Sequence, residues 1–168
     1  PTGTMANMCA ILAHCHYNKS AEMIIGTKSH INLYEGGGYA NLAGVSYKQI
    51  PEDENAMFSI DDLKDAYFND NDDHYAKSTL ICLENTHNML GGIALPASYI
   101  SSIGNMARER DMKVHIDGAR IMNAVIKRIH FQTKVNKMKF NYHTFKKLET
   151  NNIKIKTTSI HLYSTKKD

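Results

Sequence analysis

The residues best suited to chemistry lie in one short stretch, His115-Ile116-Asp117-Gly118-Ala119-Arg120. The pattern predicts a strand that ends on a carboxylate, turns at a glycine and then presents an arginine. Open α/β sheets bind their ligands at the carboxyl ends of the strands. A carboxylate there can keep a heterocyclic ring nitrogen protonated, and an arginine can bind a carboxylate or phosphate through two parallel hydrogen bonds. The same residues also fit an ordinary β-turn with a surface salt bridge.

Three other polar stretches stand where the ends of elements are expected. Thr2-Gly3-Thr4 precedes apolar residues at helical spacing, so its hydroxyls and N–H groups would form an anion site at a helix start. His30 follows an expected strand, and its flat imidazole could stack on an aromatic ring. The stretch Glu84-Asn85-Thr86-His87-Asn88 follows a buried strand and is dense in hydrogen-bond donors and acceptors. The alternatives are an ordinary helix cap, a surface or core histidine, and a polar turn.

Two further histidine segments have simpler interpretations. His74 follows Asp72-Asp73 and fits a solvated loop. His14-Cys15-His16 falls in an expected helix, where adjacent side chains point apart, and no second ligand pair has zinc spacing. The sequence therefore predicts no metal site.

The order of the expected elements predicts an α/β fold. Strands are expected at 22–25, 42–47, 78–83 and 113–117, and helices at 5–15, 30–34, 59–67, 96–110 and from 121 onward. Strands that alternate with helices of this length form a mostly parallel sheet between helical layers. We expect the strands at 79–83 and 113–117 to end at the same edge, close to Thr2-Gly3-Thr4.

Charge and composition divide the chain into two unlike parts. Residues 1–126 hold 9 Lys or Arg and 15 Asp or Glu, whereas residues 127–168 hold 11 and 2. Every glycine and proline lies before residue 119, although the turns of an α/β domain use both. We therefore expect a domain over 1–126 and a basic, poorly packed tail over 127–168. The composition favours the hypothesis that this tail is read from non-coding or frame-shifted DNA. The functional alternative is a tail that binds nucleic acid through its basic and aromatic residues.

Cysteine usage and hydropathy limit the cellular compartments in which we expect this protein. The three cysteines, Cys9, Cys15 and Cys82, are odd in number and indicate a reducing environment. The sequence contains no run of 18 apolar residues, so it predicts no membrane span. We expect a cytoplasmic protein that does not bind membranes, and a mitochondrial location is left open.

Four stretches together resemble the threonine aldolase family, pyridoxal-phosphate lyases grouped with the aromatic amino-acid β-eliminating lyases. They occur in the family's order with matching spacing, and the resemblance covers residues 1–126 almost without a gap. The stretches are Pro-Thr-Gly-Thr-Met-Ala-Asn (1–7), Ser-His-Ile-Asn-Leu-Tyr-Glu-Gly-Gly-Gly (29–38), Cys-Leu-Glu-Asn-Thr-His-Asn (82–88) and Lys-Val-His-Ile-Asp-Gly-Ala-Arg-Ile-Met-Asn-Ala (113–124). The resemblance implies part of the large domain of a fold type I enzyme, a partial three-layer sandwich that binds pyridoxal 5′-phosphate.

The family's roles transfer to matching positions. The resemblance implies that cofactor contacts come from six residues: Thr2, Gly3 and Thr4 at the phosphate, His30 stacked on the ring, Asp117 at the ring nitrogen and Arg120 at the ring oxygen. Arg120 would also bind the substrate carboxylate. The implied catalytic residues are His30 and His74 near the substrate hydroxyl, Glu84 beside them, and Asp117. Thr2 replaces the family's usual serine and keeps the hydroxyl.

The resemblance implies an amino-acid substrate: L-threonine or L-allo-threonine would be cleaved to glycine and acetaldehyde. The family's imine-forming lysine lies in a Ser-Lys-Gly-Leu-Gly-like motif about thirty residues after the aspartate, and this sequence contains no such motif. Lys146 and Lys147 stand at that distance without its glycines, which indicates coincidence. We therefore expect a truncated, inactive lyase. A non-catalytic remnant that binds the cofactor, or a pseudogene product, is the alternative. Full-length family members form homotetramers or homodimers.

Overall fold

A parallel sheet organises the protein. The computed structural model describes residues 2–16, 20–68, 72, 74–136 and 153–155. Its sheet has five strands in the order β2-β1-β3-β4-β5, and each neighbouring pair is parallel. The strands are β1 (Ala21–Gly26), β2 (Ser46–Ile50), β3 (Lys77–Glu84), β4 (Lys113–Asp117) and β5 (Ile153–Ile155). The predicted α/β class with a mostly parallel sheet is confirmed.

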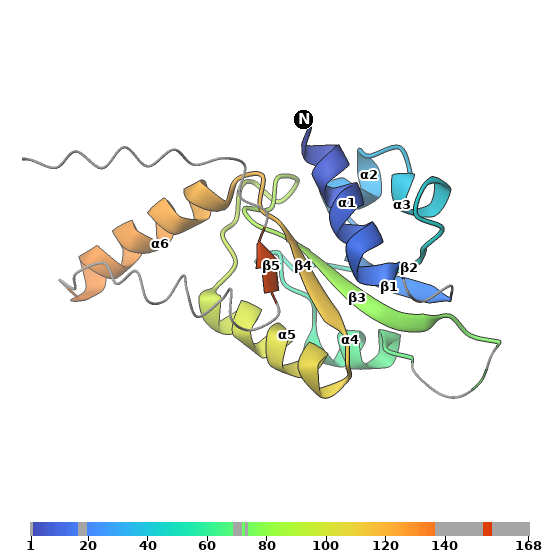
Figure 1. Ribbon diagram of the computed structural model, residues 1–168. Helices are drawn as coiled ribbons and strands as arrows, with labels where there is room; N and C mark the ends of the chain where they lie inside the picture. The colour runs from blue at the N-terminus through green and yellow to red at the C-terminus, as the bar shows by residue number, and fades with distance from the viewer. Residues whose placement is uncertain (1, 17–19, 69–71, 73, 137–152, 156–168) are drawn as a thin grey trace, which may run out of the picture.

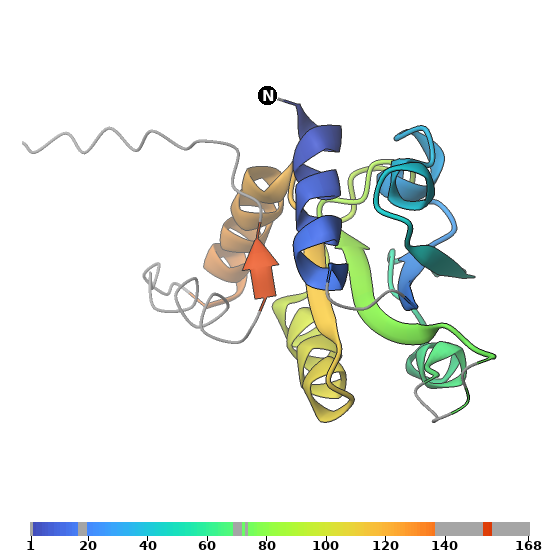
Figure 2. The same ribbon diagram turned by 45° about the vertical axis from the view of Figure 1, so that its right-hand side comes forward.

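Helices cover both faces of this sheet (Figures 1 and 2). On one face lie α1 (Gly3–Cys15), α2 (His30–Leu33) and α3 (Gly38–Asn41). On the other face lie α4 (Ile60–Ala66) and α5 (Ala97–Glu109), and α6 (Ile121–Asn136) follows β4. The arrangement is a three-layer sandwich, as the sequence predicted.

The strands bury side chains on both faces, as a covered parallel sheet requires. In β3, Leu80 and Cys82 pack in the core under α1, whereas Ile81 and Leu83 pack in the core beside α5. This alternation has a period of two residues, so Glu84 lies on the α1 side of the sheet with Cys82. The same alternation places His115 and Asp117 of β4 toward α1.

Local signals explain where the helices begin. The hydroxyl of Thr2 accepts a hydrogen bond from the N–H of Met5 at 3.1 Å, which makes Thr2 the N-cap of α1. The hydroxyl of Ser59 caps α4 in the same way. Both caps agree with the predicted helix starts.

One predicted strand lies in the wrong place. The sequence suggested a strand at 42–47, but β2 is Ser46–Ile50 and is preceded by α3. Gly44 has a φ of 64°, a left-handed conformation that redirects the chain toward the sheet. The apolar run before β2 is divided between a buried Val45 and a Leu42 that is 73% exposed, so it does not form one strand face.

The described part of the basic segment continues the fold. Arg128 donates from its guanidinium to the carbonyl of Ala94 at 3.0 Å, and β5 pairs with β4 with Ile153 opposite Val114. The remaining residues, 137–152 and 156–168, lie outside the described residues. The domain boundary near residue 126 and the poor packing of the tail therefore stay predictions. Among the described residues, no helix combines the length and apolarity needed to cross a membrane.

Candidate functional site

The candidate site lies at the carboxyl edge of the sheet. The strand pairing sets Glu84, the last residue of β3, directly opposite Asp117, the last residue of β4. Both side chains are buried, with exposures of 6% and 4%. Helix α1 packs across β3 and β4 with its first turn toward this edge (Figure 1). The predicted meeting of the two strand ends beside α1 is confirmed.

Asn7 connects the polar groups of the site. Its side-chain amide donates to Glu35 Oε1 at 2.8 Å and to Asp117 Oδ2 at 2.9 Å. Its carbonyl oxygen Oδ1 lies 3.0 Å from Nε2 of His115. Because a carbonyl oxygen only accepts, Nε2 of His115 carries the hydrogen. The opposite orientation of the Asn7 amide would turn its oxygen toward two carboxylates, so these contacts support the amide assignment.

His30 lies beside this network at the start of α2. Its ring nitrogen Nδ1 is 3.0 Å from Glu35 Oε1, and its backbone N–H donates to Glu84 Oε2 at 2.7 Å. The other oxygen of Glu84 accepts the backbone N–H of Asn88 at 2.9 Å. Glu84 therefore fastens the loop before α2 to the loop after β3. The His30 side chain is 39% exposed, so part of its ring remains accessible to a ligand.

A second buried network lies beside the first. Nε2 of His87 is 3.1 Å from Glu52 Oε1, while Thr27 and the backbone N–H of Lys28 donate to Glu52 Oε2. Burial raises the pKa of Glu52, but the hydrogen bonds from His87, Lys28 and Thr27 outweigh burial and lower it overall. A Cβ at Gly26 would overlap the Oε1 atom of Glu52, so glycine leaves room for this carboxylate.

The electrostatics of the first network favour a positively charged or N–H-bearing ligand. Glu35 and Asp117 are both buried, and neither has a Lys or Arg partner within the described residues. Oε2 of Glu35 has no hydrogen-bond partner among those residues. His30, Glu35 and Asp117 each offer one ligand atom, and the three atoms lie within 4.8 Å of one another. A protonated ring nitrogen would supply a positively charged donor to Asp117.

The structure brings together several of the residues predicted from sequence. His30, Glu84 and Asp117 meet at the carboxyl edge through the contacts above. Thr2, Gly3 and Thr4 form the exposed start of α1 near that edge. Arg120 is exposed just after β4, and no ion pair of its guanidinium is recorded within the described residues.

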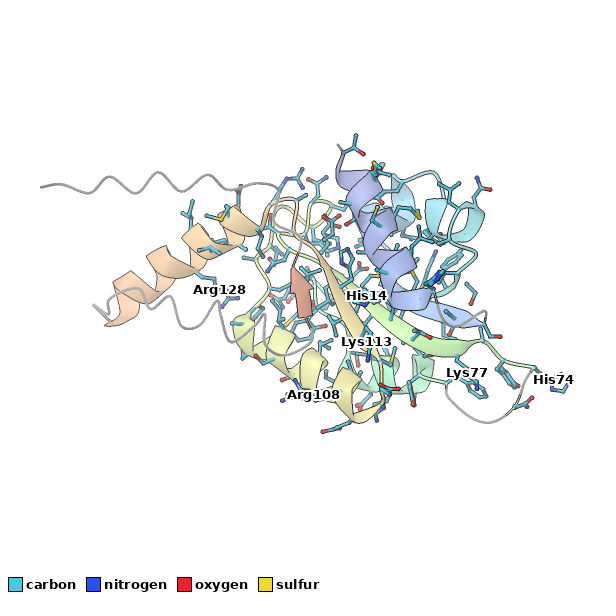
Figure 3. The ribbon with its side chains drawn as sticks, viewed as in Figure 1. His14, His74, Lys77, Arg108, Lys113 and Arg128 are labelled. Atoms are coloured by element: carbon cyan, nitrogen blue, oxygen red, sulfur yellow. The ribbon has the colours of Figure 1, made fainter. Side chains whose placement is uncertain are left out.

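His74 lies away from these residues. It precedes the amino end of β3, whereas Glu84 ends that strand, and Figure 3 shows it at the far tip of the α4–β3 connection. Its side chain is 92% exposed and its Nδ1 lies 2.6 Å from Asp72 Oδ1. The β3 strand of eight residues spans about 25 Å at about 3.3 Å per residue. The described structure therefore does not bring His74 to the site.

Five residues of the two networks were not assigned a role from sequence: Asn7, Glu35, Glu52, His87 and His115. All except Glu52 stand inside stretches that carry the family resemblance, so those stretches already contained the signal. His87 is 2% exposed and stands three residues after Glu84. Glu52 gave no signal, because it occupies a polar segment, Pro51 to Asn55, that is typical of a surface loop.

Comparisons with known proteins identify the family of this chain. Residues 1–155 match the family model described as beta-eliminating lyase. The low specificity L-threonine aldolase of Escherichia coli K12 is 38% identical over 126 residues, which cover 75% of this chain and 36% of that protein. The low-specificity L-threonine aldolase 1 of Arabidopsis thaliana is 37% identical over 127 residues, which cover 75% of this chain and 35% of that protein.

A solved structure supports the same fold. The threonine aldolase of Leishmania major superposes with a TM-score of 0.64 at 20% sequence identity, covering 73% of this chain and 34% of that one. The chain spans about a third of the length of the curated relatives it matches. The resemblance found in the sequence is confirmed, and the comparisons give no support to nucleic-acid binding by the tail.

Proposed function

Because this chain belongs to the beta-eliminating lyase family, we propose that its carboxyl-edge site binds pyridoxal 5′-phosphate and forms part of a threonine aldolase active site. The reaction would cleave L-threonine or L-allo-threonine to glycine and acetaldehyde. One observation carries the proposal: the buried carboxylate of Asp117 ends β4 with one oxygen on Asn7 and the other on the N–H of Ala119. Those two donors fix its orientation and provide no charge to balance it.

The residues present fit the cofactor by chemistry. Asp117 would hold the ring nitrogen protonated, and the half-exposed imidazole of His30 would stack on the ring. The first turn of α1 would bind the phosphate, because the first N–H groups of a helix lack intrahelical partners and the helix dipole favours an anion. Arg120 would bind the substrate carboxylate through two parallel hydrogen bonds.

The cofactor, when bound, supplies an electron sink for the bond that breaks. The protein residues must position the substrate and accept the proton of its β-hydroxyl. His30 can accept through Nε2, which has no recorded partner among the described residues. His87 is 2% exposed and its Nε2 faces Glu52, so we propose that it supports the carboxyl edge and does not contact the substrate. Glu84 would hold both loops in place.

A second candidate, cofactor binding without catalysis, is favoured by one feature of the sequence. It contains no Ser-Lys-Gly-like motif, and Lys146 and Lys147 lie outside the described residues. We expect this chain to bind pyridoxal phosphate and to release acetaldehyde from threonine no faster than the free cofactor does. The family's dimeric or tetrameric assembly and a cytoplasmic location also stay proposals, the first testable by sedimentation.

Equilibrium titration with pyridoxal phosphate tests the proposal. The chain should bind the cofactor at a single site, and binding should shift the cofactor's absorption. Asp117→Asn should weaken binding by roughly tenfold, which corresponds to about 1.4 kcal/mol for the lost charge-assisted hydrogen bond. His74→Ala is the matched control and should leave binding unchanged. Equal binding by wild type and Asp117→Asn would reject the site, and acetaldehyde well above the free-cofactor rate would reject the non-catalytic candidate.

A further inference from the structure

The imidazole of His30 is held from one side only. Its Nδ1 lies 3.0 Å from Glu35 Oε1, whereas no partner of its Nε2 is recorded among the described residues. Histidine's two nitrogens differ in role, and the hydrogen bond at one nitrogen decides whether the other donates or accepts. The partner of Nδ1 therefore decides what Nε2 offers to a ligand.

Glu35 itself has little freedom to move. Its side chain is 2% exposed, and its Oε1 accepts hydrogen bonds from the amide of Asn7 as well as facing His30. An ionised Glu35 can only accept hydrogen bonds, so its contact with neutral His30 requires the hydrogen to be on Nδ1. Gly36 and Gly37, with left-handed φ angles of 63° and 64°, turn the chain directly after Glu35.

The hydrogen bonds that hold Glu35 also reach the end of β4. The Asn7 amide that binds Glu35 also binds Asp117, and His115 fixes that amide from the opposite side. Three elements that are distant in sequence, α1, the α2–α3 connection and β4, thus share one set of buried hydrogen bonds. A shift of Asn7 would move the carboxylates of Glu35 and Asp117 together.

We propose that Glu35 is a positioning residue: locked by Asn7, it holds the hydrogen of neutral His30 on Nδ1 and leaves Nε2 as a hydrogen acceptor facing the ligand side. The use of that acceptor on a substrate hydroxyl rests on the proposed function. The tautomer itself does not, because it is a property of the chain without cofactor.

The test is nitrogen-15 NMR of the histidine rings in the full chain without pyridoxal phosphate. Spectra are recorded about two pH units above the ordinary histidine pKa of about 6.5, so that neutral rings dominate. EDTA is present, because His30, Glu35 and Asp117 lie close enough to bind a stray ion. A His30→Gln spectrum assigns the His30 resonances among the nine histidines.

Wild type should show the hydrogen of His30 on Nδ1. Glu35→Gln keeps an oxygen acceptor and should preserve that tautomer, whereas Glu35→Leu removes it and should shift His30 toward the Nε2-protonated form. Glu52→Gln, a change at the buried carboxylate that contacts His87, is the matched control and should leave His30 unaltered.

Several results would overturn the proposal. They are a wild-type hydrogen on Nε2, loss of the Nδ1 tautomer in Glu35→Gln, an unchanged tautomer in a folded Glu35→Leu, or an equal change in Glu52→Gln. If Glu35→Leu does not fold, the wild-type and Glu35→Gln spectra still decide. Because no cofactor is added, failure here is distinct from failure of pyridoxal phosphate binding.

Discussion

Replacing Asn7 by leucine should sharply destabilise the protein. The side chain of Asn7 is almost fully buried, with 1% exposure, and leucine has a similar size. The change therefore removes hydrogen bonds without opening a large cavity. It leaves Glu35 and Asp117 without their shared donor and His115 without its acceptor.

The size of the effect follows from those three contacts. Hydrogen bonds to charged groups contribute about 1.5–3 kcal/mol each, and a neutral one about 1 kcal/mol. The sum is roughly 4–7 kcal/mol, and rearrangement with entry of water at the exposed edge reduces it to about 3–5 kcal/mol, the range for breaking a buried charge network. That loss is a large part of the 5–15 kcal/mol by which a typical domain is stable.

Urea unfolding followed by far-ultraviolet circular dichroism measures the effect. With a urea slope of about 2 kcal/mol per molar, the midpoint should fall by about 1.5–2.5 M. Asn41→Leu, at an exposed position ending α3, is the control and should change stability by no more than about 0.5 kcal/mol. A loss below about 1 kcal/mol in Asn7→Leu would refute the view that this amide holds the two carboxylates.

Two further predictions concern buried ionisable groups. The pKa of Glu52 is lowered in the folded state from the ordinary value of 4.5, so its ionised form stabilises the fold above that value. This contribution is lost as the pH falls through the lower folded pKa. Glu52→Gln should therefore be less stable than wild type at neutral pH and should show a flatter loss of stability below pH 4.5, and parallel acid unfolding curves would contradict this. Burial raises the pKa of the Cys15 thiol to about 11 and raises that of Cys82 further, whereas Cys9 is exposed. An aromatic disulfide reagent should thus label one thiol in the native chain and three after denaturation, and rapid native labelling of all three would show that the core is open.

The sequence was sufficient to predict which strand ends and which helix start form the site. Parallel strands end at one edge, and the motifs after 79–83 and 113–117 marked those ends, so the residue pattern alone places Glu84 and Asp117 together. The cap at Thr2 was equally local, since it depends on a hydroxyl three residues from its donor. Such features need only the chain's own periodicity and spacing.

The contacts around Asn7 could not be predicted in the same way. Its amide reaches Glu35, 28 residues away, and Asp117, 110 residues away. No helical or strand periodicity links positions at those separations, and an asparagine in a helix is as compatible with solvent as with a core. The meeting of Glu52 with His87 depends on Gly26 making room, which is a property of packed backbones. Tertiary packing supplies these pairs.

The buried carboxylates of the site divide into two kinds according to what their oxygens already bind. Glu84 uses both oxygens on backbone N–H groups of two loops, and Glu52 uses both on Thr27, Lys28 and His87. These two carboxylates therefore hold loops in place. Asp117 instead binds one neutral amide and one N–H within its own turn, and Glu35 keeps one oxygen without a recorded partner among the described residues. What sets Asp117 and Glu35 apart is the Asn7 amide that they share. A cationic ring nitrogen bound at Asp117 would change the hydrogen bonds of that amide, and the change would reach Glu35 and the imidazole of His30.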